Sequence, residues 1–192
     1  MVITNKIKLI VLSIFLTLLC VACEIQYYET KYTKPRPIKE NVFSYAKKKF
    51  YLQDTLLIDT MSIYILIDTT CIDCAKEKSV SFFRFFANGK YVAMYEKIMD
   101  IDENINNLEK GFIGYYYITK KNVLKMQYFS WTNGGQTRTE FGLFDNGDLL
   151  VYDQHPEFAL GNQKLLEWMA GDTKKRWKKV KVSNLKPVIP NW

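Results

Sequence analysis

The chain has 192 residues, 48% of them hydrophobic and 15% aromatic, and this composition excludes an intrinsically disordered protein. The formal net charge of +7 is mildly basic. The high count of tyrosine and phenylalanine, 13 and 12 residues against 9 glycines and 5 prolines, favours a globular protein rich in β-strands.

The first 23 residues combine a basic start, an apolar stretch and an end that contains cysteine. Lys6 and Lys8 precede the largely apolar residues 9–19. A basic segment, an apolar core of about 7–15 residues and small residues before the cut define a secretory signal peptide. Residues 1–22 contain no acidic side chain and fit this plan.

The end of this segment resembles the processing site of bacterial lipoproteins, in which Leu, a small residue and Gly or Ala precede the modified cysteine. The matching positions are Cys20, Val21, Ala22 and Cys23, so that Cys20 stands where Leu is usual. The resemblance implies cleavage before Cys23 and a lipid on its sulfur, and two or more acyl chains make a stable membrane anchor. Ordinary secretion and an uncleaved membrane helix are the alternatives, although the apolar run is short of the ~20 residues that span a bilayer.

This interpretation divides the chain into three parts. Residues 1–22 are the signal peptide, residues 23–42 a lipidated tether and residues 43–192 a β-rich globular domain. The tether contains Pro35 and Pro37, which make it stiff and non-helical. Residues 43–50 fit either a short helix or a first strand. The implied location is the bacterial cell envelope, on the outer membrane and facing the periplasm or the cell surface.

From residue 56 onward the pattern predicts one strand after another. The first strand covers residues 62–68. Residues 88–89, Asn-Gly, are a signal for a type I′ hairpin turn, because both positions tolerate positive φ. Three predicted hairpins follow in chain order: 80–87 with 90–96, 111–119 with 123–131, and 137–144 with 148–153.

The remaining segments are more polar. Residues 99–109 predict an acidic connection with one helical turn. Residues 163–170 predict a short amphipathic helix that ends at Gly171. Residues 174–183 return to a strand. Its lysines alternate with Val180 and Val182, which favours a half-buried edge strand over a surface for lipid headgroups.

The predicted strands carry apolar side chains on both faces. Phe112 and Tyr116 share one face of their strand, whereas Ile113, Tyr115 and Tyr117 share the other. In a sheet with one face in solvent, apolar and polar residues would alternate more regularly along each strand. The fold class predicted is therefore mainly β: an antiparallel meander that closes into a lipocalin-like barrel or a strongly curved sheet, with one short C-terminal helix against it.

Two hairpins resemble those of lipocalin-like β-barrel lipoproteins. Residues 114–118 followed by 122–126 are similar to their G-x-Y-x-I, turn, N-x-aliphatic-x-apolar hairpin, and residues 86–91 to their F-x-x-G-x-Y hairpin. The resemblance covers residues 56–153 and implies a fold. It carries over no functional residue, because those proteins share no common site motif.

Cys71 and Cys74 are the sharpest candidates for chemistry. They form a C-x-x-C pair, which in an oxidising envelope predicts a local disulfide that crosslinks and stabilises a loop. The alternative is a thioredoxin-like redox centre, but the residues that follow predict a hairpin and not the helix that lowers a thiol pKa. Free thiols are a third alternative. Metal binding is disfavoured, because structural zinc is coordinated by four N or S ligands, and His155 is the one further residue that could act as a ligand beside the two cysteines.

Other titratable residues favour structural roles. His155 is the sole histidine and precedes a proline, which places it in a loop. Four acidic residues cluster in sequence: Asp145, Asp148, Asp153 and Glu157. Two such carboxylates are the acid and base of a glycosidase, but the composition of residues 145–148 favours a turn.

The function predicted is a non-enzymatic one: a membrane-anchored module that binds a small apolar ligand or an envelope protein. The aromatic strands either line a pocket or fill the barrel solid, and the sequence does not separate these outcomes. The alternative is an envelope thiol–disulfide oxidoreductase that uses Cys71 and Cys74. No cofactor, no metal and no nucleic-acid partner are expected. The membrane partner is reached through the lipid on Cys23.

Overall fold

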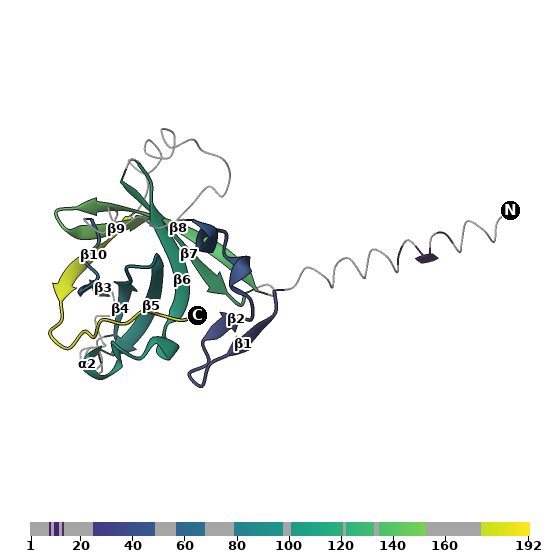
Figure 1. Cartoon of the computed structure of the whole chain (residues 1–192), viewed down its shortest axis with the longest axis horizontal. Helices are drawn as coiled ribbons and strands as arrows, with labels where there is room; N and C mark the ends of the chain where they lie inside the picture. The colour runs from purple at the N-terminus through teal and green to yellow at the C-terminus, as the bar shows by residue number, and fades with distance from the viewer. Residues whose placement is uncertain are drawn as a thin grey trace, which may run out of the picture.

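The structure is a computed structural model that describes residues 25–48, 57–67, 79–97, 101–120, 122–132, 135–152 and 174–192, together with residues 8, 10, 11 and 13. Eight of its strands form one closed antiparallel barrel in the order β10-β3-β4-β5-β6-β7-β8-β9, which Figure 1 shows from the side of the C-terminal segment. The predicted antiparallel meander and its closure into a barrel are therefore confirmed. The barrel strands are β3 (Ser62–Ile67), β4 (Ser79–Phe85), β5 (Lys90–Lys97), β6 (Phe112–Ile118), β7 (Val123–Ser130), β8 (Gln136–Asp145), β9 (Asp148–Tyr152) and β10 (Lys174–Lys181).

Strand β10 closes the barrel, and the prediction that it is an edge strand was wrong. Its first half pairs with β9, where Trp177 lies opposite Leu149, and its second half pairs with β3, where Lys179 lies opposite Tyr64. Trp177 is buried, whereas Val180 is 37% exposed. The strand is held in place by backbone pairing on both sides and by one inward tryptophan, not by the valine alternation that the sequence suggested.

Short elements outside the barrel are few among the described residues. β1 (Tyr27–Glu29) and β2 (Pro35–Pro37) pair as a small hairpin. The 3₁₀ helices η1 (Glu40–Val42) and η2 (Ser44–Lys47) follow, so that residues 44–47 form a short helix and not a first strand. α2 (Ile101–Asn104) and η5 (Leu108–Lys110) lie in the β5–β6 connection. The predicted helix 163–170 lies outside the described residues.

The apolar side chains on both faces of the strands have two destinations. Inward side chains form one core cluster that includes Tyr64, Phe85, Tyr116 and Leu124. Outward side chains of β3, β4 and β5 pack under α2 and the C-terminal segment, where Leu185 is buried. Those of β6 and β7 pack under Phe43 and η2. The barrel is therefore wrapped on its outside, as the two-sided pattern indicated.

The hairpin turns differ from the prediction in their type. At residues 88–89 only Gly89 has positive φ, and its amide donates to Phe86 O, which gives a three-residue loop with a bulge. The type I′ prediction there was wrong. Positive φ at two successive residues occurs instead at Asn146 and Gly147, which join the paired residues Asp145 and Asp148 of β8 and β9.

Two buried arginines hold the β5–β6 connection against the barrel. The Arg36 guanidinium donates to the carbonyls of Leu108 and Gly111 at 3.0 and 2.6 Å, and that of Arg84 to the carbonyl of Ile105 at 3.0 Å. Burial lowers the pKa of each arginine to about 10, and both remain charged at neutral pH. Residues 25–42, assigned to the tether above, thus include a buried side chain, and contact with the barrel begins at Ile25.

Candidate functional site

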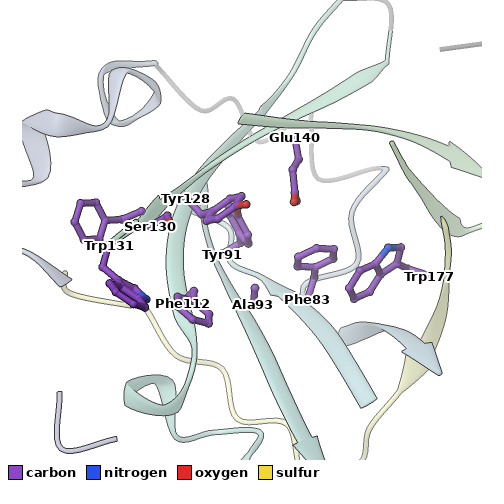
Figure 2. Close-up of a pocket in the computed structure, with 10 residues that line it drawn as sticks. Phe83, Tyr91, Ala93, Phe112, Tyr128, Ser130, Trp131, Glu140 and Trp177 are labelled. Atoms are coloured by element: carbon purple, nitrogen blue, oxygen red, sulfur yellow. The ribbon is translucent and has the colours of Figure 1, made fainter. Parts of the chain in front are cut away.

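The interior of the barrel contains a cavity of about 270 Å³ at one of its ends. This is the end at which β5 continues toward β6 and β7 toward β8, opposite the short turns 86–89 and 145–148. Figure 2 shows side chains from several strands converging on it. The lining residues are Phe83, Tyr91, Ala93, Phe112, Tyr128, Phe129, Ser130, Trp131, Glu140 and Trp177.

Period-2 alternation places most of these side chains inside, whereas Phe129 belongs to the outer cluster with Phe43 and borders the cavity from there. Phe83 lies opposite Ala93 across β4 and β5, and Ala93 lies opposite Phe112 across β5 and β6. Cross-strand partners share a face of the sheet, so the three residues form one row along the wall. The small side chain of Ala93 leaves a gap between two phenylalanines, and this gap is part of the cavity.

Gly114 makes room for the ring of Tyr91. The two residues are cross-strand partners, and a Cβ at Gly114 would lie 2.3 Å from Cε1 of Tyr91. It would also lie 2.5 Å from the carbonyl oxygen of Gln127. A glycine is therefore required here for the tyrosine ring to lie flat against the backbone.

The walls of the cavity are flat aromatic surfaces. Phe83 packs against Trp177 with ring centroids 4.1 Å apart and an interplanar angle of 31°. Phe83 also meets Tyr91 at 5.9 Å in an edge arrangement. Figure 2 shows Phe83 between these two rings, with Trp131 at the opposite side of the cavity. Trp131 is 61% exposed and therefore lies at the rim.

Two polar atoms of the wall have no hydrogen-bond partner. Among the described residues, five buried side-chain polar atoms lack a partner, and the Tyr91 hydroxyl and the Trp177 Nε1 are the two that belong to cavity residues. Tyr91 has no exposed surface and Trp177 is 8% exposed. A buried polar group without a partner costs about 1–3 kcal/mol, and the Tyr64 hydroxyl of the same core cluster carries this cost as well.

Glu140 brings a negative charge to the cavity. Its carboxylate points into the space from β8 (Figure 2). Burial raises the pKa of Tyr91 well above its usual value, and the charges of Glu140 and Tyr128 raise it further. The Tyr128 pKa is raised by burial and by Glu140, whereas Arg138 lowers it through its charge and a hydrogen bond. Both tyrosines therefore remain neutral phenols over the physiological range.

Two larger hollows, of about 420 and 540 Å³, lie on the outer wall. Arg84 lines one and Arg36 the other. Both guanidinium groups are engaged with backbone carbonyls that hold the β5–β6 connection. Their roles are accounted for by the fold, and the interior cavity is therefore the candidate site.

The residues that the sequence analysis selected do not lie at this cavity. Cys23, Cys71, Cys74 and His155 fall outside the described residues, as do Asp153 and Glu157. Asp145 and Asp148 both bind Arg176 of β10, with N···O distances of 2.6 and 3.3 Å. They therefore join two strands at a turn, as their composition suggested. Within the described ranges no group of three or more His, Cys, Asp or Glu residues could hold a metal ion.

The sequence analysis missed Glu140 and Trp177 as site residues. They lie on β8 and β10, which are not adjacent in the barrel, and each was interpreted only as part of a strand. The available signal was the alternation itself: Glu140 stands on the face of β8 that also carries Gly142 and Phe144, which makes it a carboxylate on an inward face. The part of the chain with described coordinates contains no helix that is long and apolar enough to cross a membrane.

Comparisons of the chain with protein-family models, with curated proteins and with solved structures found no match.

Proposed function

We propose that this protein is a lipid-anchored component of the bacterial cell envelope that binds a small, largely apolar ligand inside its barrel. The observation that carries the binding part is the cavity of about 270 Å³, whose wall is mostly aromatic and also includes the polar residues Ser130 and Glu140. A packing defect in an apolar core needs no polar group, whereas a binding site uses a few such groups to orient its ligand.

The anchoring part rests on the sequence of residues 1–23 alone. Cys23 carries the lipid in this proposal, the protein faces the periplasm or the cell surface from the outer membrane, and the ligand reaches the barrel from that side. Mass spectrometry of the mature N-terminus tests this part. We expect a diacylglyceryl-modified Cys23, and a mature chain that begins elsewhere or carries an unmodified cysteine would contradict it.

Dye binding tests the cavity. The full chain in phosphatidylcholine nanodiscs is titrated with N-phenylnaphthylamine, a neutral fluorophore that brightens in apolar surroundings, with empty nanodiscs as the blank. We expect saturable binding that is lost in Ala93→Leu, because the larger side chain fills the gap between Phe83 and Phe112. Ala87→Leu is the matched control, since Ala87 is exposed on the β4–β5 turn. Equal binding by both variants would show that the dye binds elsewhere.

A further inference from the structure

The proposed lipid anchor and the folded barrel are joined by a very short stretch of chain. Ile25 already packs on the outer cluster that contains Phe43, and only Glu24 separates it from Cys23. Two consecutive residues span at most about 7 Å. A lipid on Cys23 therefore holds the barrel against the bilayer surface by the part of its wall that contacts Ile25.

Ile25 lies next to the end of the barrel that contains the cavity. Its carbonyl oxygen is 3.1 Å from the position of a Cβ on Gly135, and that position is also 3.1 Å from Cζ of Phe129. The ring of Tyr27 meets the Phe129 ring with centroids 5.8 Å apart. Phe129 and the rim residue Trp131 both line the cavity. The start of the described chain and the mouth of the cavity, at Trp131, are thus neighbours on one face of the molecule.

The β1–β2 hairpin fixes this arrangement. Its two strands pair with each other, and the buried Arg36 guanidinium of β2 donates to the Gly111 carbonyl at 2.6 Å. The Lys34 Nζ lies 4.9 Å from the ring centroid of Phe112, which is another lining residue of the cavity. Figure 1 shows the hairpin outside the barrel beside β6 and β7. Because the hairpin is tied to the wall, the chain leaves the barrel at a fixed place beside the mouth.

The side chains exposed on this face suit a membrane interface. Trp131 is 61% exposed and Tyr27 is 39% exposed, and tryptophan and tyrosine concentrate at the headgroup level of bilayers. Lys34 can extend its ammonium group toward lipid phosphates while its aliphatic part stays on apolar surface. The exposed residues Glu29 and Lys31 bring charges of both signs to the hairpin. The surface therefore fits a zwitterionic leaflet and does not require an anionic one.

A second set of exposed apolar side chains lies near the opposite end of the barrel. Ile189 is 83% exposed and lines a hollow with Met61 and Ala87, beside the turn at residues 86–89. Exposure alone does not choose between the two faces. The place of the anchor does, since Ile25 lies against Gly135 at the cavity end.

We infer that the face around Tyr27, Lys34 and Trp131 lies on the phospholipid leaflet that holds the Cys23 lipid, so that the cavity opens toward lipid and not toward bulk water. This inference rests on the proposed function and specifies the surface from which its ligand enters. The leaflet is the one that faces the periplasm or the cell surface. An apolar compound dissolved in it reaches the aromatic cavity without crossing bulk water.

Paramagnetic reagents in the lipid or in the water report which end of the barrel faces the membrane. The lipidated full chain is carried in phosphatidylcholine nanodiscs, a fraction of whose headgroups carries a nitroxide. The reporters are the indole N–H of Trp131, assigned by its loss in Trp131→Phe, and the amide of Gly147, which is exposed at the opposite end. We expect the lipid nitroxide to abolish the Trp131 signal and to spare that of Gly147. A gadolinium chelate dissolved in the water, used without the nitroxide, should do the reverse.

A longer tether should release the docked face. A flexible Gly-Ser insertion of about 12 residues between Glu24 and Ile25 adds a mean reach of roughly 20 Å. In this variant the chelate should abolish the Trp131 signal, and iodide in the water should quench cavity-bound N-phenylnaphthylamine more strongly than in the wild type. The same insertion after Lys120, in the exposed β6–β7 turn, is the matched control and should keep the wild-type pattern. Both variants should retain saturable dye binding, which shows that the barrel is intact.

The outcomes distinguish this inference from the proposed function. A lipid nitroxide that abolishes the amide signal of Gly147 or Ile189 and spares Trp131, or that acts equally on both ends, would overturn the docking and leave lipidation and ligand binding in place. A wild-type Trp131 signal that the chelate abolishes would overturn it as well. An unmodified Cys23 in the mass spectrum would overturn the proposed anchor, and absence of saturable dye binding would overturn the proposed binding function.

Discussion

The two ends of the barrel interior are built from the same residue types, but one end is packed with side chains and the other contains a cavity. Near the short turns, Phe85 packs edge-on against Tyr64 and Tyr116 with centroids 5.5 and 5.0 Å apart, and the Tyr116 hydroxyl donates to the Phe86 carbonyl at 2.7 Å. Tyr91, the cross-strand partner of Phe85, is equally buried, but its hydroxyl has no partner, and it borders the cavity that occupies the other end. The Tyr64 hydroxyl of the filled end also lacks a partner, so the comparison teaches that ring packing, and not hydrogen bonding alone, decides which end is filled.

The largest expected difference between the ends is the cost of losing an aromatic ring. Phe85→Ala should lower the free energy of unfolding by about 3–5 kcal/mol, because it opens a cavity in a fully buried cluster. Phe112→Ala should cost about 1–2 kcal/mol, since Phe112 is half-buried and already borders empty space. Urea unfolding monitored by circular dichroism measures both. Similar costs would mean that the cavity end is packed as tightly as the closed end.

The next largest effect is expected at alkaline pH. Burial raises the pKa of Tyr64 to about 12 from the usual 10.0. Above pH 10 the unfolded chain releases the phenol proton while the folded chain retains it, so the free energy of unfolding falls as pH rises from about 10 to 12. Below pH 10 this group has no effect. The loss from Tyr64 amounts to about 2 kcal/mol at pH 12.

Ultraviolet absorbance of tyrosinate and the melting temperature between pH 9 and 12 check this expectation. Tyr64→Phe should flatten the decline over that interval. Tyr91 strengthens the comparison, because its pKa is raised further by Glu140, and Tyr91→Phe should flatten the decline as well. A wild-type melting temperature that stays constant up to pH 12 would contradict the account.

Removal of one buried hydroxyl that has a partner and one that has none gives a smaller and more specific contrast. Tyr116→Phe should destabilise the fold by about 1 kcal/mol, because the Phe86 carbonyl loses one of its two donors and keeps the Gly89 amide. Tyr91→Phe should leave the stability unchanged or raise it slightly, since the hydroxyl that it removes is buried without a partner. Thermal unfolding of the two variants in parallel measures the difference. A loss at Tyr91 equal to that at Tyr116 would reveal a partner for the Tyr91 hydroxyl.

Addition of side-chain volume should give the smallest contrast. A Cβ at Gly142 would lie 2.8 Å from Leu149 Cδ1 and 3.2 Å from the Leu150 carbonyl oxygen, so Gly142→Ala should cost about 1–2 kcal/mol. Ala93→Leu introduces more volume but extends into the cavity, and it should cost less than about 1 kcal/mol. Calorimetric unfolding compares the two. The reverse order would indicate that the cavity closes in solution.

Much of the barrel could be predicted because its strands obey local rules. The hairpins from residue 80 to 152 were predicted to within about two residues, since β-branched and aromatic runs alternate with turn residues. The type I′ prediction at Asn88 was wrong, because the last backbone pairing before the turn joins Phe86 and Lys90. This pairing leaves three residues, 87–89, in the loop. The role of β10 was wrong because closure of a barrel is a non-local event, which the composition of one strand does not report.

The cavity could not be predicted, because it depends on which residues of distant strands share a level of the barrel. Glu140 and Trp177 become wall residues only through the register of β8 and β10 with their neighbours. The sequence left open whether the inward aromatic residues line a pocket or fill the barrel. In the structure they fill one end of the barrel and line a cavity at the other. The alternation predicts which residues point inward, whereas the register decides how much space remains between them.

The most direct test of the account is whether a ligand contacts Ala93 inside the barrel. The full chain, labelled at its alanine methyl groups and carried in nanodiscs, is saturated with N-phenylnaphthylamine, and nuclear Overhauser effects from the dye to the methyl groups are recorded. The account predicts contacts to the Ala93 methyl, with none to that of Ala46, which packs on the outer cluster, or to that of exposed Ala87. Contacts to Ala46 or Ala87 without contacts to Ala93 would contradict it.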